Sequence, residues 1–307
     1  MSTTTGEAEK QAEVPGIRAK RRARVAWAFL TPALIVTAFV ALYPLCDTLY
    51  LSLTNTRLGN EEPARFVGLS NYVELAHDGF FLDALLLTVF FAVITVVLEI
   101  GLGLGVALLL DARFKGRSAV RAAMLVPWAI PTAVSTQMWK WMYNDVYGVF
   151  NDVLVNRLGL FSEPIAFTAD PRTSLPAAVL VDVWKTTPFV ALLLLAGLQL
   201  IPRELYEAAR VDGATRLQAF TRITLPLLRP ALLVALVFRT LDALRVFDVF
   251  YVMFGSRPDM QTLATYAHEI LVSISDVGYG SAVSTAIFLV IAVFIVIYVA
   301  LFQRRET

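Results

Sequence analysis

The stretch EAARVDGATRLQAFTRITLP, residues Glu207–Pro226, is a polar island between two long apolar blocks. Glutamate, alanine and arginine at its start favour a short helix, and Gly213 can end that helix because glycine readily adopts the left-handed conformation. A second helical run from Thr215 leads to Pro226, where proline restarts the chain at the membrane face. Ala208 and Ala209 give the first helix a flat face that another protein can approach. A solvated loop with i, i+3 charge pairs is the alternative.

The apolar blocks on either side decide the class of protein. Of the 307 residues, 57% are hydrophobic and 17% are charged, whereas soluble domains have about 25% charged residues. A helical span needs about 20 apolar residues, and six blocks are long enough: 26–50, 81–110, 119–143, 176–201, 229–254 and 282–302. Pro127 and Pro131 are expected to kink or break the third block. We therefore predict an all-α polytopic membrane protein with six transmembrane helices within residues 25–307, preceded by a disordered tail over residues 1–24.

The distribution of basic residues predicts the orientation. With the N-terminus inside, 17 of the 26 lysines and arginines fall on inner segments, five on outer loops and four within spans. By the positive-inside rule, both termini and the polar loop of about 202–228 face the cytoplasm. The net charge of +1 gives no reason to expect a nucleic-acid partner.

Two of the apolar blocks contain ionisable residues. Asp182 and Lys185 lie in the fourth block, and the fifth contains Arg239, Asp242, Arg245 and Asp248. Exposing all six to lipid would cost roughly 15 to 20 kcal/mol, so they must face protein or water. Arg239, Asp242 and Arg245 are three residues apart and therefore share one helix face.

Two interpretations of these charges remain open. They can form buried ion pairs that hold the spans together, Asp182 with Lys185 and Asp242 with Arg239 or Arg245. They can instead line a polar cavity, which we favour because intramembrane ionisable residues are functional by default. Glu99 in the second block has no partner nearby in the sequence, and we expect it to pair with Lys140 or with an arginine inside the membrane.

The polar loop carries a recognisable signature. The pattern E-A-A, three residues, Gly, nine residues, Ile, one residue, Leu-Pro is matched completely by Glu207, Ala208, Ala209, Gly213, Ile223, Leu225 and Pro226. In this it resembles the permease subunits of bacterial binding-protein-dependent ABC importers. The segments at 66–72 (FVGLSNY), 126–144, 183–202 and 224–252 resemble the sugar-importing, maltose-transporter-like branch, and VWKTTPF and FRTLDA resemble the permeases of actinobacterial trehalose importers.

The resemblance implies a fold, a location and a set of partners. The fold is that of a type I ABC importer permease in the bacterial cytoplasmic (inner) membrane. The loop acts as a coupling helix that docks on an ATPase through Glu207, Ala208, Ala209, Asp212 and Gly213. The partners are a second homologous permease, an ATPase dimer, an extracytoplasmic sugar-binding protein and membrane lipid. No cofactor belongs to this chain, because ATP and Mg²⁺ bind the partner ATPase.

The resemblance also places the substrate on the two spans that flank the loop. The cargo is a sugar, with a disaccharide such as trehalose expected, and the residues that bind it are Lys185, Thr186, Thr187, Arg239, Asp242 and Arg245. Arginine and aspartate offer a sugar bidentate donors and acceptors. The charges stand where the maltose branch has neutral polar residues.

The sequence argues against an enzyme. None of its five lysines lies in a G-x-x-x-x-G-K-[ST] loop, so ATP hydrolysis requires a separate subunit. His77 and His268 have no partner at metal-ligand spacing, so no metal site is expected. The main rival function is an ion-coupled secondary transporter that uses Glu99, Asp182 and Asp242. A membrane scaffold without transport activity is a weaker one.

Overall fold

The computed structural model describes residues 15–303 with the exception of 60–62 and 113. Its helices follow one another in this order: α1 (Pro15–Thr37), η1 (Ala38–Leu42), α2 (Tyr43–Leu51), α3 (Ser70–His77), α4 (Gly79–Asp111), α5 (Arg117–Ala129), α6 (Thr132–Met142), α7 (Val149–Asn151), η2 (Asp152–Arg157), α8 (Pro171–Gln199), α9 (Arg203–Val211), α10 (Arg216–Ala219), η3 (Phe220–Thr224), α11 (Leu225–Ala243), α12 (Asp248–Phe254), η4 (Pro258–Met260), α13 (Leu263–His268), η5 (Glu269–Ser273) and α14 (Val277–Gln303). Over the described residues, extended pairing is limited to two isolated bridges. The helical class predicted from the sequence is confirmed.

Five described segments are long and apolar enough to cross a membrane. They are Ala23–Leu51, Gly79–Asp111, Pro171–Gln199, Arg216–Phe254 and Val277–Ala300. Each overlaps one of the predicted blocks. The first helix begins at Pro15, inside the predicted tail, and residues 1–14 of that tail lie outside the described residues.

The third predicted span is not one continuous helix. α5 ends at Ala129, and Ile130 and Pro131 adopt extended conformations before α6 begins. The cause is local: proline has no N–H to donate and disfavours the helical conformation in the residue before it. The block at 119–143 is therefore two short helices, and six uninterrupted spans are not present in the described chain.

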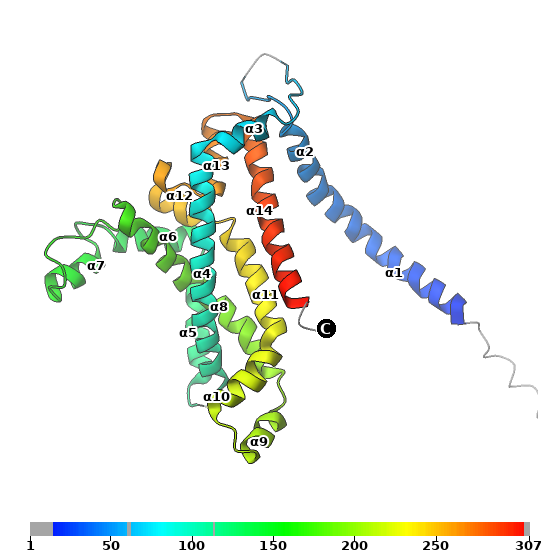
Figure 1. Ribbon diagram of the computed structural model, residues 1–307, viewed down its shortest axis with the longest axis vertical. Coiled ribbons are helices and arrows are strands. Elements are labelled where there is room, and N and C mark those ends of the chain that lie inside the picture. Colours follow the sequence, from blue (N-terminus) through cyan, green and yellow to red (C-terminus); the bar gives the residue numbers. More distant parts are fainter. Residues whose placement is uncertain (1–14, 60–62, 113, 304–307) are drawn as a thin grey trace, which may run out of the picture.

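A bundle of long helices forms the body of the protein. α4, α8, α11 and α14 run side by side (Figure 1), and α4 packs against α8 along much of its length. At Gly103 of α4 a Cβ atom would lie 2.6 Å from the side chain of Val190 in α8, so only glycine permits this close approach. Buried aliphatic side chains from α4, α8 and α11 fill the space between them.

The bundle has two distinct ends and one projecting arm. α9 and α10 lie at one end, and α3 and α13 lie at the other (Figure 1). α1 points away from the bundle, and the most apolar part of the segment Ala23–Leu51 buries none of its residues against the described chain. α2 returns to the bundle and packs against α14.

Candidate functional site

The polar loop forms the two short helices that its sequence predicts. α9 ends at Val211, Asp212 is its C-cap residue, and Gly213 follows with φ +76°. The Gly213 N–H donates to Arg210 O (3.1 Å) and the Ala214 N–H to Ala209 O (2.8 Å), which is the Schellman arrangement that completes a helix end. The turn is therefore built on the left-handed conformation that glycine supplies.

The second half of the loop is also capped. The Thr215 hydroxyl accepts from the Gln218 N–H, and the Gln218 side chain accepts from the Thr215 N–H, so α10 begins with a capping box. The Tyr206 and Thr224 hydroxyls are hydrogen bonded at 2.9 Å, which ties α9 to the chain just before α11. Glu207 and Ala208 remain exposed, and Val211 is 88% exposed.

The charges inside the bundle converge on one guanidinium. Arg239 of α11 donates from Nε to Glu99 Oε2 (2.5 Å) and from Nη2 to Glu99 Oε1 (2.9 Å). Nη2 also donates to Asp182 Oδ2 of α8 (3.0 Å), and Nη1 donates to Asp242 Oδ2 (2.5 Å). We call Arg239, Glu99, Asp182 and Asp242 the Arg239 cluster. It joins α4, α8 and α11.

Burial divides the members of this cluster. The side chains of Arg239 and Glu99 are 2% and 0% exposed, and that of Asp182 is 9% exposed. The Asp242 side chain is 68% exposed. Thr186 adds a buried hydroxyl that donates to Glu99 Oε1 and to Asp182 O. The cluster is therefore internal except at Asp242.

Lys185 does not pair with Asp182 as the ion-pair interpretation expected. Its ammonium group donates to Ile130 O at 2.6 Å, at the break between α5 and α6. A carbonyl freed by a helix break inside a membrane needs such a partner. Lys140 plays a similar part for α12, because it donates to Val252 O at 2.7 Å rather than pairing with Glu99.

The predicted substrate residues separate into two groups. Arg239, Lys185 and Thr186 are buried and bonded to the protein itself. Asp242 and Arg245 are exposed, at the end of α11 and in the break between α11 and α12. Arg245 donates only from Nε, to Leu241 O at 3.2 Å, among the described residues. The Thr187 hydroxyl oxygen is buried and has no partner in the described chain.

Sequence reasoning left Glu99 and Asp182 out of the predicted site, although both are central to the cluster. The available signal was their charge within an apolar span. Glu99 was expected to meet Lys140 or an intramembrane arginine, and the arginine alternative is the one that the structure contains.

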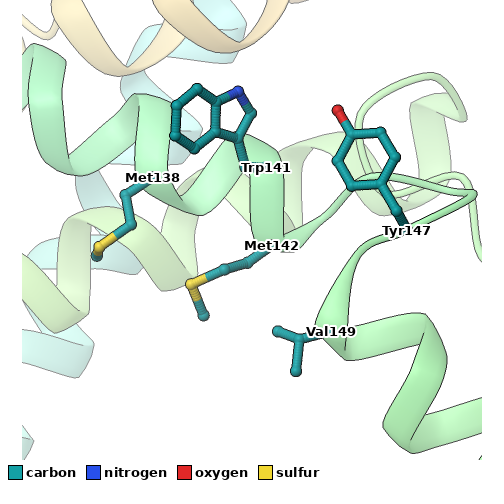
Figure 2. A pocket seen from close by; sticks show the side chains of 5 residues that line it. All are labelled: Met138, Trp141, Met142, Tyr147 and Val149. Carbon is teal, nitrogen blue, oxygen red and sulfur yellow. The ribbon is translucent and has the colours of Figure 1, made fainter.

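Two pockets lie elsewhere on the molecule. One is open and mostly apolar, lined by Met138, Trp141, Met142, Tyr147 and Val149 (Figure 2). The other, of about 500 Å³, lies near α3 and α13 and includes Asp78, which accepts hydrogen bonds from the hydroxyls of Tyr266 and Tyr279. Neither contains a member of the Arg239 cluster.

Comparison with known proteins identifies the family. Residues 99–307 match the model of the binding-protein-dependent transport system inner membrane component. The trehalose/maltose transport system permease protein MalF of Thermococcus litoralis is 43% identical over 93% of this chain and 96% of its own. The sulfoquinovosyl glycerol transport system permease protein SmoG of Agrobacterium fabrum is 40% identical over 90% of each chain. The trehalose transport system permease protein SugA of Mycobacterium tuberculosis is 37% identical over 91% of this chain and 89% of its own.

A solved structure supports the same fold. The crystal structure of a bacterial ABC transporter involved in the import of the acidic polysaccharide alginate has a chain that superposes with a TM-score of 0.80. That chain is 23% identical, and the match covers 94% of this chain and 98% of that one. A second similar structure, with a TM-score of 0.80 and 22% identity, is that of a bacterial alginate ABC transporter in complex with an alginate pentasaccharide-bound periplasmic protein.

The chain therefore belongs to the family of binding-protein-dependent ABC transporter permeases. It is a membrane-embedded transport subunit for sugars and not an enzyme, and ATP hydrolysis belongs to a separate subunit.

Proposed function

We propose that this permease carries a neutral disaccharide, of which trehalose is the leading candidate, across the bacterial cytoplasmic membrane with energy from ATP. It pairs with a second homologous permease and an ATPase dimer, and an extracytoplasmic sugar-binding protein delivers the cargo. Both termini and the loop with α9 and α10 face the cytoplasm, where ATP is available. The named relatives support the disaccharide, since two of the three carry trehalose in their names.

One observation carries the proposal: α9, α10 and η3 are the elements that connect α8 to α11, and these two helices carry Asp182, Lys185, Arg239 and Asp242. A displacement of α9 and α10 is therefore transmitted directly to α8 and, through η3, to α11. In this account Glu207, Ala208, Ala209, Asp212 and Gly213 form the surface that docks on the ATPase. Gly213 supplies the turn and the two alanines supply the flat contact.

The sugar contacts the exposed residues Asp242 and Arg245 on the helix face that also carries Arg239. Asp242 presents carboxylate oxygens as acceptors, and Arg245 presents guanidinium donors one helical turn further on. Adjacent hydroxyls of a sugar match such a donor and acceptor pair. Arg239, Lys185 and Thr186 bond to the protein itself, and the Thr187 hydroxyl oxygen is buried, so we leave these four residues out of the proposed sugar contact.

Purification of the tagged complex tests the docking role. The wild-type chain is expected to retain a second permease and an ATPase subunit in mild detergent. Glu207→Lys reverses the charge on the docking face and should release the ATPase while the second permease stays bound. Glu204→Lys is the matched control, because Glu204 is exposed on the same helix but outside the docking residues. Retention of the ATPase by Glu207→Lys, or a wild-type chain that purifies alone, contradicts the proposal.

A further inference from the structure

The buried members of the Arg239 cluster have no direct access to a ligand. The side chains of Glu99 on α4 and Asp182 on α8 are 0% and 9% exposed, and both bond to Arg239, which in turn bonds to the exposed Asp242. One buried carboxylate is enough to neutralise the Arg239 guanidinium and to join two helices, but Glu99 and Asp182 both bind it. The second carboxylate indicates that the cluster does more than hold helices together.

The guanidinium is fixed in its plane by its partners. Both oxygens of Glu99 accept from it, at 2.5 and 2.9 Å, and Asp182 accepts from Nη2 at 3.0 Å. Bidentate contact of this kind sets the orientation of an arginine as well as its position. Thr186 in turn donates to Glu99, so the carboxylate that holds Arg239 is itself held.

This fixed guanidinium orients Asp242. Its Nη1 holds Asp242 Oδ2 at 2.5 Å, while no hydrogen bond or ion pair from the described residues reaches Oδ1. An ordinary exposed i, i+3 pair is weak because both side chains are mobile. Here one partner, Arg239, is 2% exposed and is held by Glu99 and Asp182, so Oδ2 of Asp242 has a fixed anchor while the Asp242 side chain is 68% exposed.

We infer that Glu99 and Asp182 are positioning residues for sugar recognition, which act through Arg239 to aim Oδ1 of Asp242 at a hydroxyl of the transported sugar. The inference rests on the proposed function and adds two residues to its site. A carboxylate oriented in this way accepts from a neutral sugar and repels an anionic group at the same position. The cluster therefore determines specificity as well as affinity.

The test compares uptake kinetics of single and double variants. Membrane vesicles containing the full complex and its binding protein are given radiolabelled trehalose or maltose, and the apparent KM and the maximal rate per assembled complex are measured. Asp242→Asn replaces a charged acceptor by a neutral one and should raise the KM by about three- to tenfold, the range expected for the loss of one ordinary hydrogen bond. Glu99→Gln places amide hydrogens against the Arg239 donors and should raise the KM similarly.

The double variant separates positioning from structure. If Glu99 acts through Asp242, Glu99→Gln adds nothing to the KM of Asp242→Asn. The inference is overturned if the increases in KM from the two substitutions multiply in the double variant. It is also overturned if Glu99→Gln lowers the number of assembled complexes and leaves the KM unchanged. Asp83→Asn is the control, because Asp83 is an exposed acid on the same helix as Glu99, and it should leave the KM unchanged. If Glu99→Gln does not assemble, Asp182→Asn is judged by the same criteria.

The same data distinguish this inference from the function on which it rests. A raised KM for Asp242→Asn with a wild-type KM for Glu99→Gln and Asp182→Asn overturns the positioning role alone. A wild-type KM for Asp242→Asn, or no saturable uptake of either sugar by the unmodified complex, overturns the proposed substrate face and the inference together.

Discussion

Arg239 of α11 donates two hydrogen bonds to Glu99 of α4, a residue 140 positions earlier in the chain, and both side chains are almost completely buried. This pair connects the second apolar block of the sequence to the fifth. With Asp182 of α8 on the same guanidinium, it fixes the relative positions of three long helices. α8 and α11, the helices that flank the loop with α9 and α10, are thus joined by the Arg239 cluster as well as through that loop.

Replacement of Arg239 should destabilise the protein more than replacement of Glu99. Arg239→Met leaves two buried carboxylates without a cation, whereas Glu99→Gln leaves the guanidinium with two carboxylates. Breaking a buried pair costs about 3 to 5 kcal/mol. We expect Arg239→Met to lower the melting temperature and the yield of the complex sharply. Arg245→Met is the control, because Arg245 is exposed and should change stability by less than about 0.5 kcal/mol. Equal melting temperatures for Arg239→Met and Glu99→Gln, or for Arg239→Met and Arg245→Met, would refute this.

Gly213 should tolerate only residues that accept a positive φ. Its φ of +76° costs a β-branched residue about 1 to 2 kcal/mol, although a Cβ there would meet no other atom within 4 Å. Gly213→Val is therefore expected to distort the turn and reduce both ATPase retention and sugar-stimulated ATP hydrolysis, with normal membrane insertion. Gly213→Asn should behave almost like the wild type, since asparagine adopts this conformation more easily. Identical coupling in the two variants would show that the turn conformation is not needed.

The end of the bundle that contains α3 and α13 should lose stability in acid. Burial acts to raise the pKa of Asp78, but hydrogen bonds from Tyr266, Tyr279 and the Phe80 N–H outweigh it and leave the pKa below its usual value. A lowered folded-state pKa gives stability that is present above the unfolded value, near 3.8, and is lost as the pH falls through the folded value. Unfolding of the complex between pH 6 and pH 3 should show this loss.

Asp78→Asn provides the comparison for that measurement. The amide does not titrate, so this variant should be less stable than the wild type near pH 6 and should approach it as the pH falls below about 4. Tyr266→Phe removes one of the hydrogen-bond donors to Asp78. The stability that this variant loses between pH 6 and pH 3 should therefore be smaller than the loss in the wild type, but not zero. A constant gap between the wild type and Asp78→Asn across this range would contradict the role given to the carboxylate.

Local chemistry explains which features the sequence predicts. The turn at Gly213 and the interruption at Pro131 depend on the conformations that glycine and proline allow, and both are visible in a few neighbouring residues. Long apolar runs likewise predict helices, although hydrophobicity alone did not reveal that the third block is two helices. These features need no knowledge of how the helices pack.

The partners of the buried charges depend on packing and were only partly predictable. Spacing placed Asp242 next to either Arg239 or Arg245, and nothing local distinguishes the two arginines. In the structure Asp242 pairs with Arg239. Glu99 and Asp182, which come from two other helices, bind the same guanidinium and hold it in place. The partner of Lys185 was equally unpredictable. It is the backbone carbonyl of Ile130, and the pattern of side chains in the sequence does not show which carbonyls are free to accept.

The energy source is the most direct test of the account. Right-side-out vesicles with the reconstituted complex, in which the α9 and α10 end faces the lumen, are loaded with ATP, and uptake of radiolabelled trehalose or maltose is followed while the proton and sodium gradients are collapsed with ionophores. The account predicts that uptake follows the ATP concentration on the side of α9 and α10 and persists without either gradient. Uptake that stops when the gradients collapse while ATP remains high would contradict it and would favour an ion-coupled transporter.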